Sequence, residues 1–138
     1  MKKLLCLVCV LVVAPIASAA DGVGVFQAGL RDFQINGADA LLGTWYGTDA
    51  DQERLARLRE RLNKLSRELG PVVDTQVFAP HSLGRHVQRL YGVLYFQKRP
   101  LWLRADFYEI NGRSGFVALE FSLVPDDVLP LTWVTLRE

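Results

Sequence analysis

Apolar and polar residues alternate along three consecutive segments of residues 85–124, RHVQRLYGVLYF, LWLRADFYEI and SGFVALEFSLV. This pattern predicts three antiparallel strands joined by two hairpins, because successive side chains of a strand point to opposite faces. One face of the predicted sheet is apolar. Its residues are Leu90, Gly92, Leu94, Phe96, Leu101, Leu103, Ala105, Phe107, Val117, Leu119, Phe121 and Leu123.

The two hairpin loops must keep these apolar sets on one face. A four-residue loop at residues 97–100 does so for the first hairpin and places Phe96 opposite Leu101 and Gly92 opposite Ala105. In the second hairpin, a two-residue turn at Asn111-Gly112 would mix charged and apolar residues on each face. We therefore predict a three-residue loop, with a left-handed Gly112 and a bulge there.

The second face of the predicted sheet is rich in aromatic and charged residues. They are Arg89, Tyr91, Val93, Tyr95, Trp102, Arg104, Asp106, Tyr108, Phe116 and Glu120. A sheet face that meets only water does not usually carry so many aromatic residues. We expect a partner subunit, a ligand or another part of the chain to cover it.

Helical periodicity precedes the strands. Leucines at positions 55, 58, 62, 65 and 69 form an apolar stripe, which Asp49 or Asp51 would cap and Gly70-Pro71 would end. Residues 21–33 and 38–46 are two further predicted helices, and residues 72–78 are a first strand. The expected class is α+β, with N-terminal helices packed on a curved antiparallel sheet of about four strands.

The first nineteen residues have the pattern of a secretory signal peptide. A basic start, Met1-Lys2-Lys3, precedes an apolar run over residues 4–16 and the small residues Ala17-Ser18-Ala19. Cleavage there would leave a single domain, residues 20–138, without cysteine, in the periplasm or secreted. Loss of Lys2 and Lys3 leaves 14 basic against 15 acidic residues, a net charge of −1. This argues against nucleic acid or, after cleavage, a membrane as partner.

Several short motifs resemble small exported members of the nuclear transport factor 2-like (cystatin-like cone) superfamily. They are the hairpin YFQKRPLW at residues 95–102, Phe107-Tyr108 followed by Asn111-Gly112, and Pro125-Asp126-Asp127 at the end of a strand. The resemblance covers roughly residues 26–127 and implies a curved sheet that wraps the helices. Members of this superfamily range from enzymes to non-catalytic binding and dimerising domains, so the resemblance leaves the function open.

The resemblance also implies where chemistry would reside in an enzyme, since such enzymes use a cavity carboxylate with Tyr or His. Asp106 and Glu120 are the candidates here, with Tyr91 and Tyr108 as hydrogen-bond partners. Cross-strand pairing with arginine favours a structural role for both carboxylates instead. His81 and His86 have no further metal-ligand residue type nearby. We assign no catalytic residue, cofactor or metal.

Two hypotheses remain. The first is a non-catalytic module that forms a homodimer or another interaction through the second face, with these residues: Tyr91, Tyr95, Trp102, Arg104, Asp106, Tyr108, Phe116 and Glu120. The alternative is a carrier of a small apolar ligand, or an acid–base enzyme, with a pocket between helices and sheet. Its lining would be Phe26, Phe33, Trp45 and Tyr46.

Overall fold

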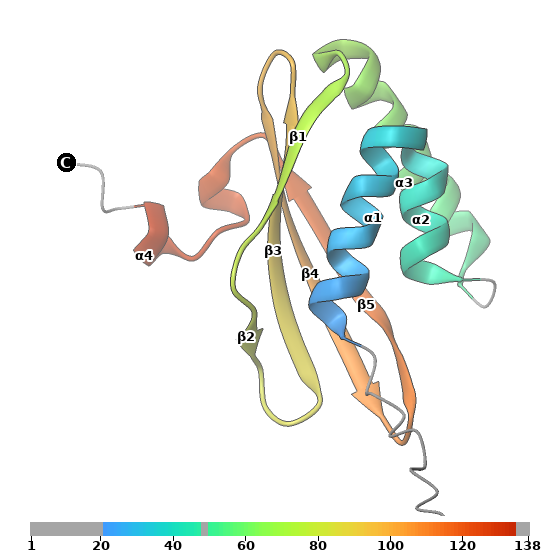
Figure 1. Ribbon diagram of the computed structural model, residues 1–138, viewed down its shortest axis with the longest axis vertical. Coiled ribbons are helices and arrows are strands. Elements are labelled where there is room, and N and C mark those ends of the chain that lie inside the picture. The colour runs from blue at the N-terminus through green and yellow to red at the C-terminus, as the bar shows by residue number, and fades with distance from the viewer. Residues whose placement is uncertain (1–20, 48–49, 135–138) are drawn as a thin grey trace, which may run out of the picture.

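The structure, a computed structural model, describes residues 21–47 and 50–134, so the predicted signal peptide lies outside the described residues. Three helices precede a sheet and two short helical turns (Figure 1). In chain order the elements are α1 Gly22–Asn36, α2 Ala38–Tyr46, α3 Gln52–Leu69, β1 Val72–Val77, β2 His81–Ser82, β3 Val87–Phe96, β4 Pro100–Ile110, β5 Arg113–Ser122, the 3-10 helix η1 Pro125–Asp127 and α4 Leu131–Val134. None of the helices in the described ranges has the length and apolarity that crossing a bilayer requires.

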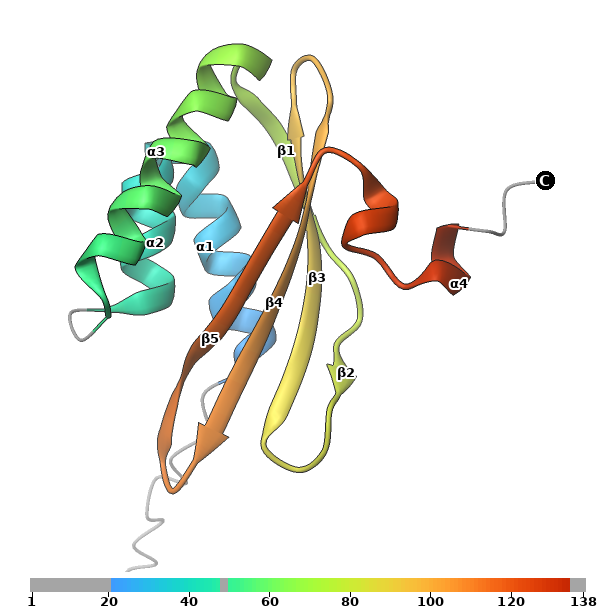
Figure 2. The same cartoon turned by 180° about the vertical axis from the view of Figure 1, so that it is seen from behind.

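The α+β class is confirmed, with five strands in the described part of the chain. Their order is β1-β3-β4-β5, and the two-residue strand β2 also pairs with β3. The strand β2 has only two residues, which are too few for an alternating pattern to predict a strand. The helices α1, α2 and α3 lie on one side of the sheet, whereas η1 and α4 lie on the other (Figure 2).

The longest helix, α3, forms as its leucine stripe predicts. Asp51 is its cap, and the side-chain oxygen Oδ1 accepts hydrogen bonds from the backbone N–H groups of Glu53 and Arg54 at 3.0 and 3.4 Å. Gly70 ends the helix with a positive φ of 85°, a conformation that glycine adopts readily. The stripe is buried on the core side at Leu55, Leu58, Leu62 and Leu69.

The first hairpin keeps the predicted faces but not the predicted register. Tyr95 lies opposite Pro100, and Gly92 lies opposite Leu103 instead of Ala105. The pairing of β3 with β4 therefore ends at Tyr95 and not, as we predicted, at Phe96. Each residue of β3 pairs with a residue of β4 that is two positions earlier than we predicted. Because side chains alternate between the faces with a period of two, every side chain keeps its predicted face, and Leu94 still faces the core.

For the second hairpin, the predicted positive φ of Gly112 is confirmed, but the predicted loop length and bulge position were wrong. Asn111 and Gly112 form a two-residue turn in which both residues have positive φ, 50° and 74°, and Ile110 pairs with Arg113. A bulge further along restores the parity, because Phe107 pairs with Phe116 but Asp106 pairs with Ala118. Val117 is left as the extra residue of β5.

The bulge also corrects the position of two side chains. Phe116, which we had placed on the second face, is only 7% exposed and belongs to the core under the helices. Val117, which we had placed in the apolar core, is 53% exposed. A parity change in the middle of β5 accounts for both differences.

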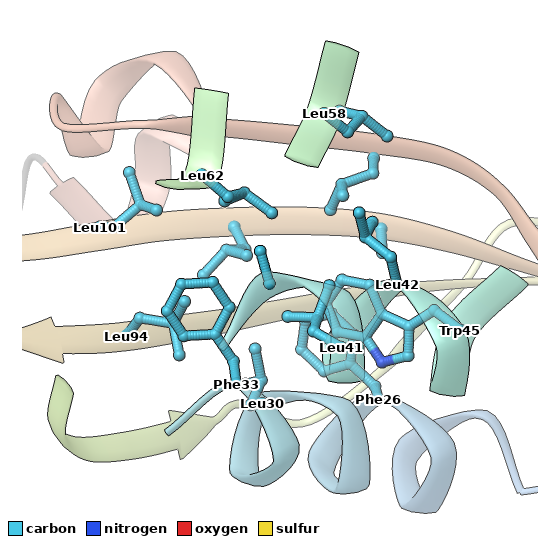
Figure 3. Close-up of a cluster of buried hydrophobic side chains, with 14 of the residues drawn as sticks. Phe26, Leu30, Phe33, Leu41, Leu42, Trp45, Leu58, Leu62, Leu94 and Leu101 are labelled. Atoms are coloured by element: carbon cyan, nitrogen blue, oxygen red, sulfur yellow. The ribbon is translucent and has the colours of Figure 1, made fainter. Parts of the chain in front are cut away.

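The core joins all three long helices to the sheet (Figure 3). Phe26 of α1 stacks on Trp45 of α2 with ring centroids 5.0 Å apart. Gly29 makes this packing possible, because a Cβ atom there would lie 2.0 Å from Nε1 of Trp45. The position of the Trp45 indole therefore requires a residue without a side chain at position 29 of α1.

We expect the Gly29→Ala variant to lose about 1–3 kcal/mol of unfolding free energy, since the rigid indole of Trp45 must move. Gly43→Ala in α2 is the matched control. No atom lies within 4 Å of its added Cβ, and alanine favours a helix over glycine by about 1 kcal/mol. Urea unfolding measures both, and equal stabilisation of the two variants would contradict the proposed role of Gly29.

Candidate functional site

The residues proposed for the second sheet face lie together there, with the exception of Phe116. Those that share the face away from the helices are Tyr91, Tyr95, Trp102, Arg104, Asp106, Tyr108 and Glu120. Trp102 is half-buried and Tyr108 is 36% exposed, whereas Tyr91 is only 5% exposed. The face is thus covered unevenly.

The charged side chains of this face pair across strands. Arg89 holds Asp106 through two hydrogen bonds, from Nε at 2.8 Å and from an amino group at 3.1 Å. The hydrogen bond to Asp106 also raises the pKa of Arg89. Arg104 pairs with Glu120, as the cross-strand argument predicted. Both carboxylates that we considered for acid–base chemistry are therefore neutralised by arginine.

The C-terminal segment covers the β1–β3 side of the face. Trp133 of α4 packs against the rings of Phe78, His81 and Tyr91, with centroid distances of 5.5, 5.3 and 5.1 Å. The hydroxyl of Ser122 donates to Asp127 of η1 at 2.8 Å and ties the segment to β5. The sequence left open whether a partner subunit, a ligand or another part of the chain covers this face. At Tyr91, another part of the chain covers it.

The two histidines serve local contacts. His81 packs in the aromatic cluster around Trp133, and Nδ1 of His86 lies 3.0 Å from the carbonyl oxygen of Glu109. In residues 21–47 and 50–134, no group of three or more His, Cys, Asp or Glu side chains is arranged to hold a metal ion.

A cavity of about 540 Å³ lies at the other side of the sheet, where α2 ends, α3 begins and β5 is bulged. Its size is within the range of about 300–1,000 Å³ found for small-molecule sites. Two of the four predicted pocket residues, Trp45 and Tyr46, line it. The other two, Phe26 and Phe33, are packed in the core and do not line the cavity.

Aromatic rings form the inner wall of the cavity. The ring of Phe116 lies 5.2 Å from both Trp45 and Phe107 between centroids. Nε1 of Trp45 donates to the carbonyl oxygen of Val25 at 3.1 Å, so the polar atom of the indole is satisfied. Sequence reasoning missed Phe116 and Phe107 as cavity residues, because the bulge that turns Phe116 inward gives no local signal.

One polar atom in this wall has no partner. The hydroxyl of Tyr46 is buried and makes no hydrogen bond with any described residue. Burial raises the pKa of this hydroxyl above its ordinary value, although the positive charge of Arg54 partly opposes the shift. At neutral pH the group is therefore protonated and uncharged.

Comparisons of the chain with protein-family models, with curated proteins and with solved structures found no match. The argument for function therefore rests on the residues of the site.

We expect Tyr46→Phe to increase the unfolding free energy of the ligand-free protein by about 1 kcal/mol, because a buried hydroxyl without a partner is costly. Tyr95→Phe is the matched control. The hydroxyl of Tyr95 donates to Gln76 at 2.6 Å, so its removal should lower stability by up to about 1 kcal/mol. Thermal and urea unfolding should therefore show a gain of stability for Tyr46→Phe and a loss for Tyr95→Phe. A clear loss of stability in Tyr46→Phe would contradict the absence of a partner for its hydroxyl.

Proposed function

We propose that the protein is a non-catalytic binding domain that holds a small, mainly apolar ligand in the cavity between α2, α3 and β5. The cavity itself, which Trp45, Tyr46, Phe107 and Phe116 line, carries this proposal. Ligand sites characteristically combine apolar walls with a few polar groups that point inward.

The positions of the carboxylates support binding without catalysis. Asp106 and Glu120 lie on the opposite face of the sheet, and each is paired with an arginine. Asp51 lines the cavity, but it accepts two backbone hydrogen bonds as the cap of α3. A general base needs a carboxylate that can reach the substrate proton, and the cap role restricts Asp51.

The proposed family and location follow from the sequence. We propose a small member of the nuclear transport factor 2-like superfamily, which is exported to the periplasm or beyond by the signal peptide of residues 1–19. The order of three helices followed by an antiparallel sheet supports the family assignment at the level of architecture.

Blocking the cavity mouth tests the binding function. Val117 lines the cavity and is 53% exposed, so Val117→Trp should fill the mouth without altering the core. The control is Val73→Trp, which changes the extra valine of the other bulged edge strand, β1, and is 59% exposed. We expect the neutral fluorophore N-phenyl-1-naphthylamine to bind the wild type and Val73→Trp, with binding to Val117→Trp reduced about tenfold or more.

Native mass spectrometry of residues 20–138 purified from a periplasm complements this assay, since it would show a retained ligand directly. Equal fluorophore binding by both valine variants, or none by the wild type, would contradict the proposed cavity function.

A second candidate function is homodimer formation through the part of the outer sheet face that remains partly exposed. Trp102 and Tyr108 favour it, because aromatic side chains are enriched at interface centres and neither is fully buried. The paired charges of Arg104 and Glu120 would then lie between these two aromatic residues.

For this dimer, we expect Trp102→Glu to give a folded monomer, because a buried charge would oppose association. Analytical ultracentrifugation with circular dichroism measures mass and folding together. Ile35→Glu on α1, where the native side chain is 76% exposed, is the control that should leave the assembly unchanged. An unaltered dimer in Trp102→Glu would refute the interface.

A further inference from the structure

We propose that residues 125–134, which contain η1 and α4, are a releasable strap that blocks self-association through the outer sheet face. We call this segment the C-terminal strap. When the strap leaves the sheet, the face beneath it binds a second copy of the chain. This inference rests on the second candidate function, homodimer formation, and names the device that regulates it.

A small core, separate from the one under the helices, lies on the outer face. Tyr91, Val93 and Val128 are 5%, 0% and 2% exposed, and none of them belongs to the main core cluster. Val93 lies directly opposite Trp102, so both side chains point away from the three long helices. Within residues 21–47 and 50–134, η1 and α4 lie on this side of the sheet (Figure 2). The strap therefore accounts for the complete burial of Val93.

The strap is attached in a way that allows its release. The helix α4 has four residues, none of them buried, and Trp133 is 36% exposed although it makes the ring contacts described above. Backbone hydrogen bonds to the carbonyl oxygens of Pro125 and Pro130, 2.8–3.0 Å long, close within the strap. So short a helix is not stable without its packing. Release of the strap leaves every β-ladder intact, since the strap belongs to no strand.

The closed strap leaves too little apolar surface for a stable dimer. Trp102 and Tyr108 are only partly exposed and lie six positions apart on β4. An aromatic side chain buries about 150–250 Å² when it is fully covered, whereas a stable interface needs about 800 Å² from each partner. Release adds Tyr91 and Val93, which lie on the neighbouring strand β3, and so joins the exposed rings into one patch.

The charges of this face favour a second copy as the occupant. A two-fold dimer brings the same patch of both chains together, so unpaired charges there would meet their own kind. Arg89 holds Asp106 at 2.8 Å, and Arg104 pairs with Glu120. Each chain thus presents apolar rings between neutralised pairs, and such a patch meets its own copy without net repulsion.

Trp133→Ser tests the release, because it removes the ring contacts at a partly exposed position and leaves the main core unchanged. We expect the Kd for dimerisation of residues 20–138 to fall at least about tenfold, since a closed state weakens apparent binding in proportion to the open fraction. Trp133→Phe, which keeps a ring, and Thr132→Ala, at the exposed neighbouring position, are the controls and should stay close to the wild type. Sedimentation velocity over a dilution series measures the Kd.

Two further measurements report the strap itself. His81 packs against Trp133, whereas His86 contacts the carbonyl oxygen of Glu109. In Trp133→Ser, we expect the nuclear magnetic resonance signals of the His81 ring to shift and those of His86 to stay in place, which also shows that the variant is folded.

Hydrogen exchange of the wild type tests the release without any substitution. The amide of Trp133 should exchange faster than that of Leu103 in the centre of the sheet, because the strap opens without global unfolding. Exchange of both amides only through global unfolding would overturn the inference.

The outcomes of the association assay separate the strap from the dimer on which it rests. Equal Kd values for the wild type and Trp133→Ser would overturn the regulatory role and leave the dimer intact. Weaker association of Trp133→Ser would overturn it as well, since Trp133 would then belong to the interface. Association of Trp133→Ser that persists after Trp102→Glu is added would identify another surface and overturn the inference. Absence of association in both proteins would overturn the inference and the second candidate function together.

Discussion

The parity of the β4–β5 hairpin is the constraint on which the remaining structure depends. The turn at Asn111 and Gly112 is the two-residue kind that suits the twist of paired strands, but it places the apolar residues of the two strands on opposite faces. The bulge at Val117 restores a common apolar face for the rest of β5. Without it, Leu119 would point away from the helices, so burial of the core requires the bulge.

The same bulge shapes the cavity. It leaves Phe116 directed to the helices, beside Trp45, while Val117 remains at the exposed mouth. A second bulge occurs on β1, where Val72 pairs with Phe96 and Asp74 pairs with Tyr95. The two strands at the ends of the order β1-β3-β4-β5 are thus both irregular. Bulges bend and twist a strand, and they make an edge less able to pair with another chain.

The sequence predicted those features that depend on local periodicity. The leucine stripe of α3 and the opposite faces of β3 and β4 follow from side-chain spacing alone. The sequence could not predict the geometry of the β4–β5 hairpin. A longer loop at Gly112 and a distant bulge at Val117 would each place the apolar residues of the two strands on the same face. Packing of Phe116 against Trp45 selects the second solution. For the site, Trp45 and Tyr46 were predictable as residues at a helix end, whereas Phe107 and Phe116 depend on the bulge.

The two candidate surfaces differ in how far their polar groups are hydrogen-bonded within the chain. On the outer sheet face, Arg89 and Asp106 already hydrogen-bond within the chain, as do Arg104 and Glu120. A partner there would gain apolar contact but no new charge pairing, unless it first disrupted these pairs. In the cavity, the hydroxyl of Tyr46 lost its hydration on folding and received no partner from the described residues. Among the described residues, the unmet polar group thus lies on the helix side of the sheet, in a residue that lines the cavity we propose as the binding site.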